Sequence, residues 1–270
     1  MGELTRALDI EGPCIHSGGF GVIRIEPYDR GAHFRLAASD APEIVSLHNY
    51  RPEFLTSAVI NSSGRMALCP EHVLSSCLLL GMTGFCITRM TGPYEFPVGP
   101  RSRSYVELLL DDIGVPTEIP AGVRIEVDMS ITIDSNSHLT TMRSSSAKID
   151  VSWQNGGYRA MFGIGRVPVL ADILSLGSSR SFILSADVAR LQRRGRLLGA
   201  KDADRWLQVL TDYEFSEEML AECAQHKTYD FLGDMCPLGG MPIGMLKIAQ
   251  PGHAVNDTVR NVLTSLSEAS

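Results

Sequence analysis

The alternation of hydrophobic and polar positions predicts the first strands of the chain. Residues 22–25, 33–36, 55–60 and 85–90 show the two-residue period of a strand with one buried face. The run Asn61 to Gly64 is typical of a hairpin turn. Apolar residues recur at helical spacing over 71–80, directly after Pro70, and a second short helix is expected at 104–110. The first part of the chain is therefore expected to mix strands and helices.

A stretch rich in proline and glycine, Pro116 to Gly122, separates this part from a second one with a similar pattern. Strict alternation from Val123 to Ile133 predicts one long strand, and residues 149–153 and 158–162 predict a hairpin around 154–157. Helices are expected at 168–176, 186–195, 202–210, 216–232 and 254–266, and a strand at 243–249. We therefore predict an α+β fold of two similar domains, residues 1–117 and 118–270, each a small sheet with helices packed on it. The similar pattern of the two parts suggests a remote structural duplication.

Composition narrows the class of protein. Hydrophobic residues make up 44% of the 270 positions and charged residues 20%, which suits a packed core. The net charge of −7 argues against nucleic acid as the main partner. The most apolar stretch, Val73 to Ile87, is too short to span a bilayer, and the first ten residues lack a secretion signal. We therefore expect a cytoplasmic protein without stable membrane insertion, and nothing in the sequence indicates an oligomeric state.

Three polar residues follow one another at intervals of four near the C-terminus. His226, Asp230 and Asp234 would lie along one stripe of a helix, where an imidazole and a carboxylate one turn apart can share a metal ion. The alternative is an ordinary surface pair, which is the commoner meaning of such a spacing. Tyr229 and Phe231 interleave this stripe, however, so it is expected to be half buried, and a buried carboxylate requires a partner.

The pair Glu71 and His72 opens the helix predicted at 71–80. A catalytic zinc takes three protein ligands and leaves one position open, so His72 is the natural third ligand beside His226 and Asp230. Glu71 could then accept a proton from a water molecule. Taken alone, Glu71 and His72 are better explained as a polar helix N-terminus, and His253 can be an ordinary capping residue after Gly252. The six cysteines include no pair at CxxC spacing, so we expect buried thiols and no cysteine zinc site.

Together these segments resemble the zinc-dependent UDP-3-O-acyl-N-acetylglucosamine deacetylases of lipid A biosynthesis, the LpxC family, in order along most of the chain. Residues 226–234 match the family's HKxLDxxGDL closely, with Tyr229 at a usually aliphatic position, and residues 252–256 match SGHxLN. These two motifs are specific. Weaker similarities lie at 15–18, 71–74, 92–98 and 179–199. The family fold has two α+β domains that sandwich the active site between their sheets.

The resemblance implies a role for nine residues. His72, His226 and Asp230 would hold Zn²⁺, although two His and one Asp also suit Fe²⁺. Glu71 would be the general base, and His253 would be the general acid, oriented by Asp234. Ser181 would donate its hydroxyl to the oxyanion in place of a family Thr. Lys227 would face a substrate phosphate or carbonyl oxygen, and Phe182 would line the sugar or acyl opening. His16 lies in a matched motif, and we assign it no chemical role.

Two regions depart from the family pattern. Arg101 and Arg103 replace an acidic or neutral loop, where they either bind phosphate or are simply solvated. Residues 199–225 replace an insert that forms an apolar passage for the fatty acyl chain. The spacing of Trp206, Leu207 and Leu210 among charged residues predicts an amphipathic helix there instead.

These observations favour a zinc-dependent N-deacetylase acting on an amino sugar, such as a nucleotide sugar or a nucleoside-like molecule. UDP-3-O-acyl-N-acetylglucosamine is the alternative substrate, because the acyl passage is expected to be absent or reshaped. A non-catalytic binding module with a residual zinc site is the alternative of another class. Intact Glu71 and His253 argue against it, and the lack of an HExxH motif argues against a zinc peptidase.

Overall fold

The computed structural model describes residues 2–38, 41–53, 56–155, 158–201, 205–211 and 216–268. The strands are β1 (Leu8–Pro13), β2 (Phe20–Pro27), β3 (Ala32–Ala38), β4 (Ala41–Ser46), β5 (Tyr50–Glu53), β6 (Thr56–Ile60), β7 (Met66–Leu68), β8 (Phe85–Thr91), β9 (Ala121–Arg124), β10 (Met129–Thr132), β11 (His138–Met142), β12 (Ala147–Asn155), β13 (Tyr158–Gly165), β14 (Ser181–Leu184), β15 (Leu207–Leu210) and β16 (Met241–Ala249). The helices are α1 (Glu71–Leu79), α2 (Tyr105–Ile113), α3 (Leu170–Ser178), α4 (Ser185–Arg193), α5 (Glu217–Met235) and α6 (His253–Glu268), with short 3₁₀ turns at Leu47–Asn49 and Cys236–Leu238.

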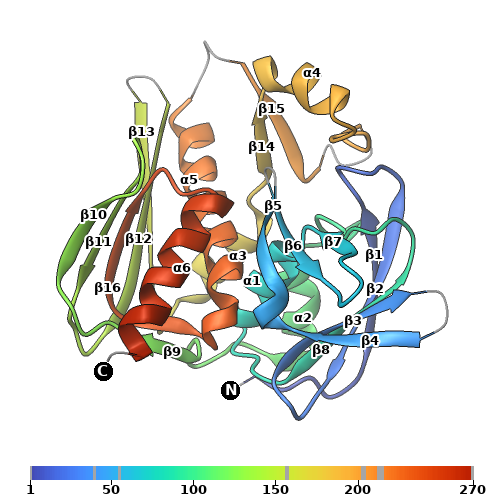
Figure 1. Cartoon of the computed structure of the whole chain (residues 1–270), viewed down its shortest axis with the longest axis horizontal. Coiled ribbons are helices and arrows are strands. Elements are labelled where there is room, and N and C mark those ends of the chain that lie inside the picture. Colours follow the sequence, from blue (N-terminus) through green and yellow to red (C-terminus); the bar gives the residue numbers. More distant parts are fainter. Residues whose placement is uncertain are drawn as a thin grey trace.

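Two sheets with the same topology flank the molecule (Figure 1). The first has the order β1-β2-β8-β3-β4 and the second β10-β11-β16-β12-β13, with β9 attached to β16. In both sheets the central strand is antiparallel to one neighbour and parallel to the other, and each outer pair is antiparallel. The structure thus confirms two similar α+β halves. The exact boundary between 117 and 118 stays a prediction.

The two halves carry different insertions at the same point of their topology, before the central helix. The first inserts the small sheet β5-β6-β7, and the second inserts α3 and the parallel pair β14 and β15 with α4 between them. Helices α1 and α5 lie side by side between the two large sheets (Figure 1). All nine residues of α1 are buried, including the polar ones, because a sheet and another helix cover it from both sides. Both insertions therefore reach the same central region.

The strand predicted from Val123 to Ile133 is interrupted. The chain forms β9 at 121–124 and β10 at 129–132, because its partner changes between them. Strand β9 pairs with the start of β16, whereas β10 pairs with β11, which occupies the same edge of β16 farther along. The chain must therefore step around β11 between Ile125 and Asp128. The alternating pattern continues through this step, so it did not reveal the break.

The helix predicted at 202–210 is also wrong. Residues Leu207 to Leu210 form β15, which pairs in parallel with β14; residues 202–204 lie outside the described part of the chain. Trp206, Leu207 and Leu210 are buried while Val209 is exposed. Over so few residues, their spacing fits a strand as well as a helix. Pairing with β14, which lies more than 20 positions earlier in the chain, decides in favour of the strand.

The other predicted elements agree with the structure to within a few residues. The hairpin turn after Ile60 joins β6 to β7, and β12 pairs with β13; Leu55 and the turn residues 156–157 lie outside the described residues. Ser104 and Ser216 cap α2 and α5 with their hydroxyls. All six cysteines are buried free thiols, as expected. Among the described helices, none combines the length and apolar character that crossing a bilayer requires.

Candidate active site

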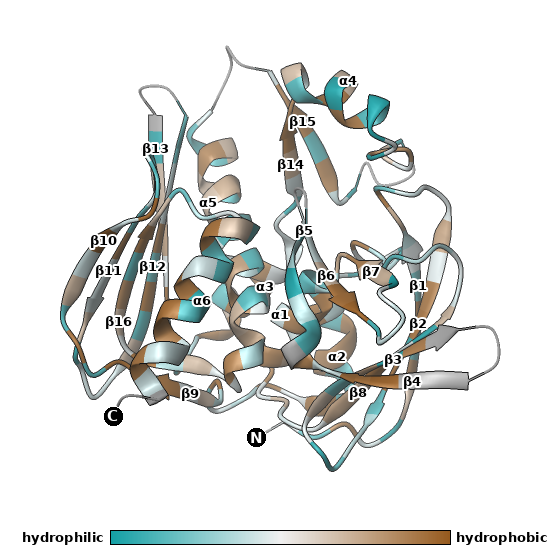
Figure 2. Cartoon of the chain, viewed as in Figure 1, coloured by the Kyte–Doolittle hydropathy of each residue, from teal (hydrophilic) through white to brown (hydrophobic). Residues whose placement is uncertain are grey.

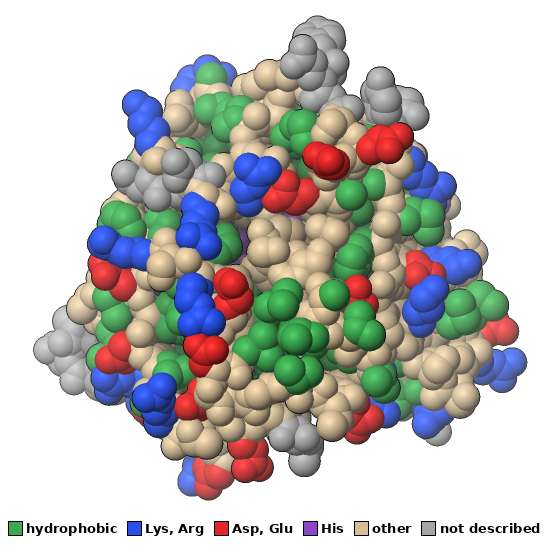
Figure 3. Space-filling view, turned by 180° about the vertical axis from the view of Figure 1, so that it is seen from behind, with side chains coloured by type: hydrophobic (Ala, Val, Ile, Leu, Met, Phe, Trp, Pro, Cys, Tyr) green, Lys and Arg blue, Asp and Glu red, His purple; other side chains and the backbone are tan. Residues whose placement is uncertain are grey.

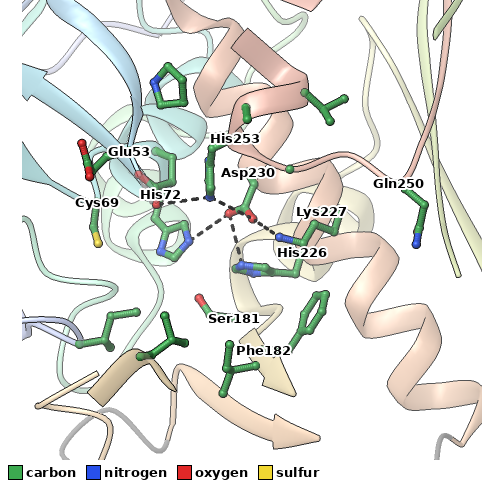
Figure 4. Close-up of a pocket in the computed structure, with 18 of the residues that line it drawn as sticks. Glu53, Cys69, His72, Ser181, Phe182, His226, Lys227, Asp230, Gln250 and His253 are labelled. Atoms are coloured by element: carbon green, nitrogen blue, oxygen red, sulfur yellow. Dashed lines mark hydrogen bonds and ion pairs between the residues drawn. The ribbon is translucent and has the colours of Figure 1, made fainter. Parts of the chain in front are cut away.

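Three side chains converge between α1 and α5. The Nε2 atoms of His72 and His226 both lie 3.2 Å from Asp230 Oδ1. The ligand atoms of the three residues all lie within 4.8 Å of one another, and each residue is buried (Figure 4). Two imidazoles and a carboxylate around one point form a donor set for a divalent metal ion with positions left open. Because His72 comes from the first half of the chain and the other two from the second, any such ion would bridge both halves.

The orientation of both imidazoles fits metal binding. His72 Nδ1 lies 2.8 Å from the carbonyl oxygen of Val98, and His226 Nδ1 lies 3.3 Å from that of Ser179. A carbonyl oxygen only accepts, so each Nδ1 carries the proton and each Nε2 keeps its lone pair. Backbone partners of this kind fix the tautomer and ring orientation of histidine ligands. The donor set is therefore prepared for a metal by the surrounding chain.

A close contact between α1 and α5 brings these residues together. A Cβ atom at Gly233 would overlap the carbonyl oxygen of Glu71 and crowd the hydroxyl of Ser75. The hydroxyl of Ser75 donates to the carbonyl oxygen of Tyr229, and the hydroxyl of Tyr229 donates to the carbonyl oxygen of His72 at 2.9 Å. These contacts explain why a polar α1 is stable in the interior, since its buried polar groups have partners.

Glu71 lies on the rim of the ligand set. Its carboxylate accepts a hydrogen bond from Thr56 Oγ1 at 2.7 Å and faces the backbone N–H of Ser57, both on β6. Burial raises the pKa of this carboxyl above its usual range, and the neighbouring His253 and His72 only partly oppose the rise. Its Oε1 lies 3.9 Å from His253 Nε2. A buried carboxylate of raised pKa beside a metal site is suited to taking up a proton.

His253 lies opposite, at the start of α6, and Asp234 holds it. Its Nδ1 donates to Asp234 Oδ2 at 2.9 Å, which leaves Nε2 directed at Glu71 and Asp230. Burial alone would lower the pKa of His253, but the Asp234 carboxylate, together with Glu71 and Asp230, raises it to about 9. The imidazole is therefore protonated at neutral pH. A cation with its proton directed toward the ligand set can act as a general acid.

The Asp234 carboxylate has an unusually complete set of donors. Tyr50 OH and Ser57 Oγ donate to Oδ1, the latter at 2.7 Å, and Asn256 Nδ2 donates to Oδ2 at 2.7 Å. Burial would raise the pKa of Asp234, but His253 and these hydrogen bonds lower it below the usual range. Asp234 therefore stays ionised. It lies behind His253 and does not itself line the cavity.

The remaining predicted residues line the same cavity, of about 810 Å³. Lys227 Nζ lies 3.0 Å from Asp230 Oδ2 and 5.1 Å from the centre of the Phe182 ring. Ser181, at the start of β14, lines the cavity next to the ligand set (Figure 4). The structure thus brings together eight of the nine predicted site residues in one cavity wall, with Asp234 immediately behind.

The far wall of the cavity is apolar. Ile183, Leu191, Leu197 and Leu207, from β14, α4, the loop after it and β15, pack together and line it. Of these four side chains only Leu207 belongs to residues 199–225, and the other three precede that segment. The apolar wall is therefore built mainly from residues 183–197, which agrees with the expectation of a reshaped passage and not with that of an absent one. The wall includes Leu207 because Leu207 to Leu210 form a strand instead of the expected helix. The cavity therefore joins a polar, metal-binding half to an apolar half.

Sequence reasoning missed the residues that support the site from β5 and β6. Tyr50, Thr56 and Ser57 are buried and hold Asp234 and Glu71, but they lie in no recognisable motif. Glu95 is fully buried and accepts the backbone N–H groups of His16 and Ser17, which explains how the matched segment at 15–18 is held. A glutamate within an apolar stretch was the available signal for Glu95, and no comparable signal exists for Tyr50.

Arg101 and Arg103 lie outside the cavity. Arg101 pairs with Glu11 at 2.7 Å and lies over the ring of Phe20, and Arg103 pairs with Asp111 at 2.5 Å. Of the two alternatives for this loop, the structure supports solvated arginines at surface ion pairs.

Comparison with known proteins agrees with this geometry. The family model LpxC, UDP-3-O-acyl N-acetylglycosamine deacetylase, matches residues 2–265. A protein of Nautilia profundicola named UDP-3-O-acyl-N-acetylglucosamine deacetylase is 22% identical over 273 residues, covering 97% of this chain and 91% of that protein. One of the same name from Anaeromyxobacter sp. strain Fw109-5 is 22% identical over 269 residues, covering 96% and 87%. The match spans both halves and every residue of the ligand set, and the chain belongs to the LpxC family of deacetylases.

Proposed function

We propose that this protein is a zinc-dependent deacetylase that removes the N-acetyl group from an amino sugar carrying a fatty acyl chain. The substrate that we propose is UDP-3-O-acyl-N-acetylglucosamine, after which both relatives are named. One observation carries the proposal: the ligand set of His72, His226 and Asp230 shares a cavity with Glu71 and His253, and the same cavity continues into an apolar wall.

The ligand set fits Zn²⁺ because its two imidazoles expose lone pairs and its carboxylate supplies negative charge. Bound there, the ion would polarise the acetamide carbonyl and make a water molecule acidic enough to react near neutral pH. Hydrolysis then forms one carbon–oxygen bond and breaks the carbon–nitrogen bond, so one proton must leave the water and one must reach the nitrogen.

Glu71 supplies the first of these proton transfers. Its buried carboxylate takes the proton of the attacking water, which its raised pKa favours. Thr56 and Ser57 keep the carboxylate oriented while it does so. Ser181 donates its hydroxyl to the oxygen that becomes negative, in the manner of an oxyanion-hole donor.

His253 supplies the second proton transfer, the one to the leaving nitrogen. An amide anion is a very poor leaving group, so the nitrogen must be protonated as its bond to carbon breaks. The imidazolium of His253, held by Asp234, delivers that proton from Nε2. Lys227 would bind an oxygen of the substrate, and the ring of Phe182 would pack against the sugar or the first part of the acyl chain.

The apolar wall favours an acylated substrate over the unacylated one that the sequence favoured. Four aliphatic side chains in contact offer a fatty chain a surface shielded from water, and each buried methylene contributes about 0.8 kcal/mol. An unacylated nucleotide sugar would leave that surface exposed to water. The preference for it rested on an absent or reshaped passage, and the apolar wall argues against an absent one.

Acetate release is the direct test. The protein would be stripped of metal, reloaded with Zn²⁺ or Fe²⁺, and assayed on UDP-3-O-acyl-N-acetylglucosamine and on UDP-N-acetylglucosamine. We expect turnover of the acylated sugar by the reloaded protein and none by the metal-free protein. Full activity without metal would contradict the mechanism, and turnover of the unacylated sugar alone would contradict the substrate. A metal-loaded protein inactive on both would favour a binding module.

A further inference from the structure

Helix α4 presents a basic face to solvent. Arg190, Arg193 and Arg194 lie at positions i, i+3 and i+4, so their side chains emerge on one side of the helix, and all three are exposed. Lys201, shortly after the helix, is exposed as well. In Figure 3, Lys and Arg side chains lie at the upper left, over the flank that carries α4. Leu191, on the other side of the helix, is buried and lines the cavity.

The charge of this segment is opposite to that of the rest of the molecule. Residues 185–201 contain five Lys and Arg residues and one Asp, a net charge of +4, in a chain whose total is −7. The rest of the chain therefore carries −11. Asp202 and Asp204 follow this segment directly, outside the described residues, so residues 181–210 as a whole contain six Lys and Arg residues and three Asp, a net charge of +3. A polyanionic surface would attract this side of the molecule and repel the others.

Exposed apolar side chains accompany the basic ones. Leu198 is 59% exposed and Val209, on β15, is 54% exposed. Figure 2 shows hydrophilic residues on α4 above the hydrophobic strand β14. The unit formed by β14, α4 and β15, which we call the α4 unit, is thus basic with apolar side chains at its surface, and its inner side forms the apolar wall of the cavity.

We propose that the α4 unit docks the protein peripherally on an anionic lipid bilayer. Basic residues near a membrane are attracted by acidic headgroups, and apolar side chains such as Leu198 gain by entering the interface. A nucleic acid or an acidic protein would satisfy the charges but would leave the exposed Leu198 and Val209 without an apolar partner. Docking in this orientation places the apolar cavity wall next to the phase in which fatty acyl chains dissolve. The inference goes beyond the proposed reaction and needs no turnover to be tested.

Vesicle sedimentation tests the proposal with the full-length, zinc-loaded protein. Vesicles of phosphatidylcholine alone would be compared with vesicles containing 40% phosphatidylglycerol, at low salt and in 0.5 M NaCl. We expect at least a fivefold larger bound fraction on the anionic vesicles at low salt, and a fall to the level of the neutral vesicles at high salt, because counterions screen exposed charges. Equal binding to both vesicles, or no binding to either, would overturn the proposal.

Charge reversal locates the surface. The double variant Arg193→Glu with Arg194→Glu should lose the anionic preference while its circular dichroism and deacetylase activity on a dispersed substrate stay unchanged. The matched control, Arg124→Glu with Arg143→Glu, changes net charge equally at exposed positions of the second half and should keep the preference. If the control loses binding as much as the α4 variant does, net charge and not the α4 unit is responsible.

Leu198→Ser tests the apolar contribution and should lower vesicle binding at intermediate salt. Binding equal to that of the wild type would show that Leu198 does not enter the membrane interface.

Discussion

At the scale of single residues, the site separates two carboxylates by their surroundings. Asp234 accepts hydrogen bonds from Tyr50, Ser57, Asn256 and His253 and stays ionised, whereas Glu71 has few donors and a raised pKa. The same functional group thereby stays an anion at Asp234 and has a raised pKa at Glu71, which suits the proposed role of Glu71 as a proton acceptor. This contrast gives each residue a distinct expected phenotype.

Replacing Glu71 by Gln should abolish most turnover and leave metal binding intact. The amide keeps the size of the side chain and can still meet Thr56, but it cannot accept the proton of the water. Loss of a general base lowers rates by about 10²–10⁴. The measurement is kcat for acetate release alongside zinc content by elemental analysis. A variant within about tenfold of the wild-type rate would show that Glu71 is not the base.

Tyr50→Phe should lower kcat by about tenfold with little change in KM. The variant removes one donor to Asp234 and weakens its hold on His253, but Tyr50 does not line the cavity. Tenfold corresponds to about 1.4 kcal/mol, the scale of one hydrogen bond to a charged group when another donor remains. Tyr105→Phe is the matched control, because it removes a buried hydroxyl that donates to the carbonyl oxygen of Pro97 and does not contact Asp234 among the described contacts. A rise in KM at constant kcat would instead mean that Tyr50 acts on substrate binding.

At the scale of elements, the contact between α1 and α5 sets the spacing of the ligands. Gly233→Ala should destabilise the protein by about 1–3 kcal/mol, the usual cost of overpacking a core, because its Cβ would overlap the carbonyl oxygen of Glu71. Gly165→Ala is the control, since the nearest atom to its Cβ lies 3.8 Å away. Chemical denaturation gives both values. Equal midpoints for the two variants would show that the helices separate without cost.

In the proposed function, the β14 and β15 pair supplies part of the surface that binds the fatty chain. Ile183→Asn should lower kcat/KM for the 3-O-acylated sugar by about tenfold or more, because it places an amide in the apolar wall. Val209→Asn, the control on the neighbouring strand, changes a residue that is already 54% exposed and outside the cavity wall. The rates would be compared across a series of acyl lengths. An effect independent of chain length would show that this wall does not bind the chain.

At the scale of the whole molecule, the ligand set joins the two halves. His72 lies on α1 in the first half, and His226 and Asp230 lie on α5 in the second. Zinc at about 100 times its dissociation constant should stabilise the folded chain by about 2.7 kcal/mol. For a chain of this size, that is a rise of roughly 5–10 °C in Tm.

Differential scanning calorimetry of the metal-free and zinc-loaded protein measures this shift. His226→Gln should remove it, whereas His138→Gln, at an exposed position of β11, should retain it. A zinc-dependent rise of the same size in the His226 variant would place the metal at another site.

The local part of this architecture was readable from the sequence. The stripe of His226, Asp230 and Asp234 depends only on helical spacing. The strands β2, β3, β8, β12, β13 and β16 were predicted from patterns within about ten residues, whereas β1, β4, β5 and β7 were not. Motif order then identified the family before any geometry was known. Such features are encoded in neighbouring positions, so a single chain reveals them.

What only the tertiary structure decided depends on partners distant in sequence. The break between β9 and β10 arises because β11 occupies the edge of β16, and Leu207 to Leu210 is a strand because β14 pairs with it. Tyr50 supports Asp234 across 184 positions. No periodic pattern records such pairings, because periodicity reports which face of a segment is buried but not what buries it. The residues that meet in the cavity could therefore be named from the sequence, whereas the residues that support them and the apolar wall became known only from the fold.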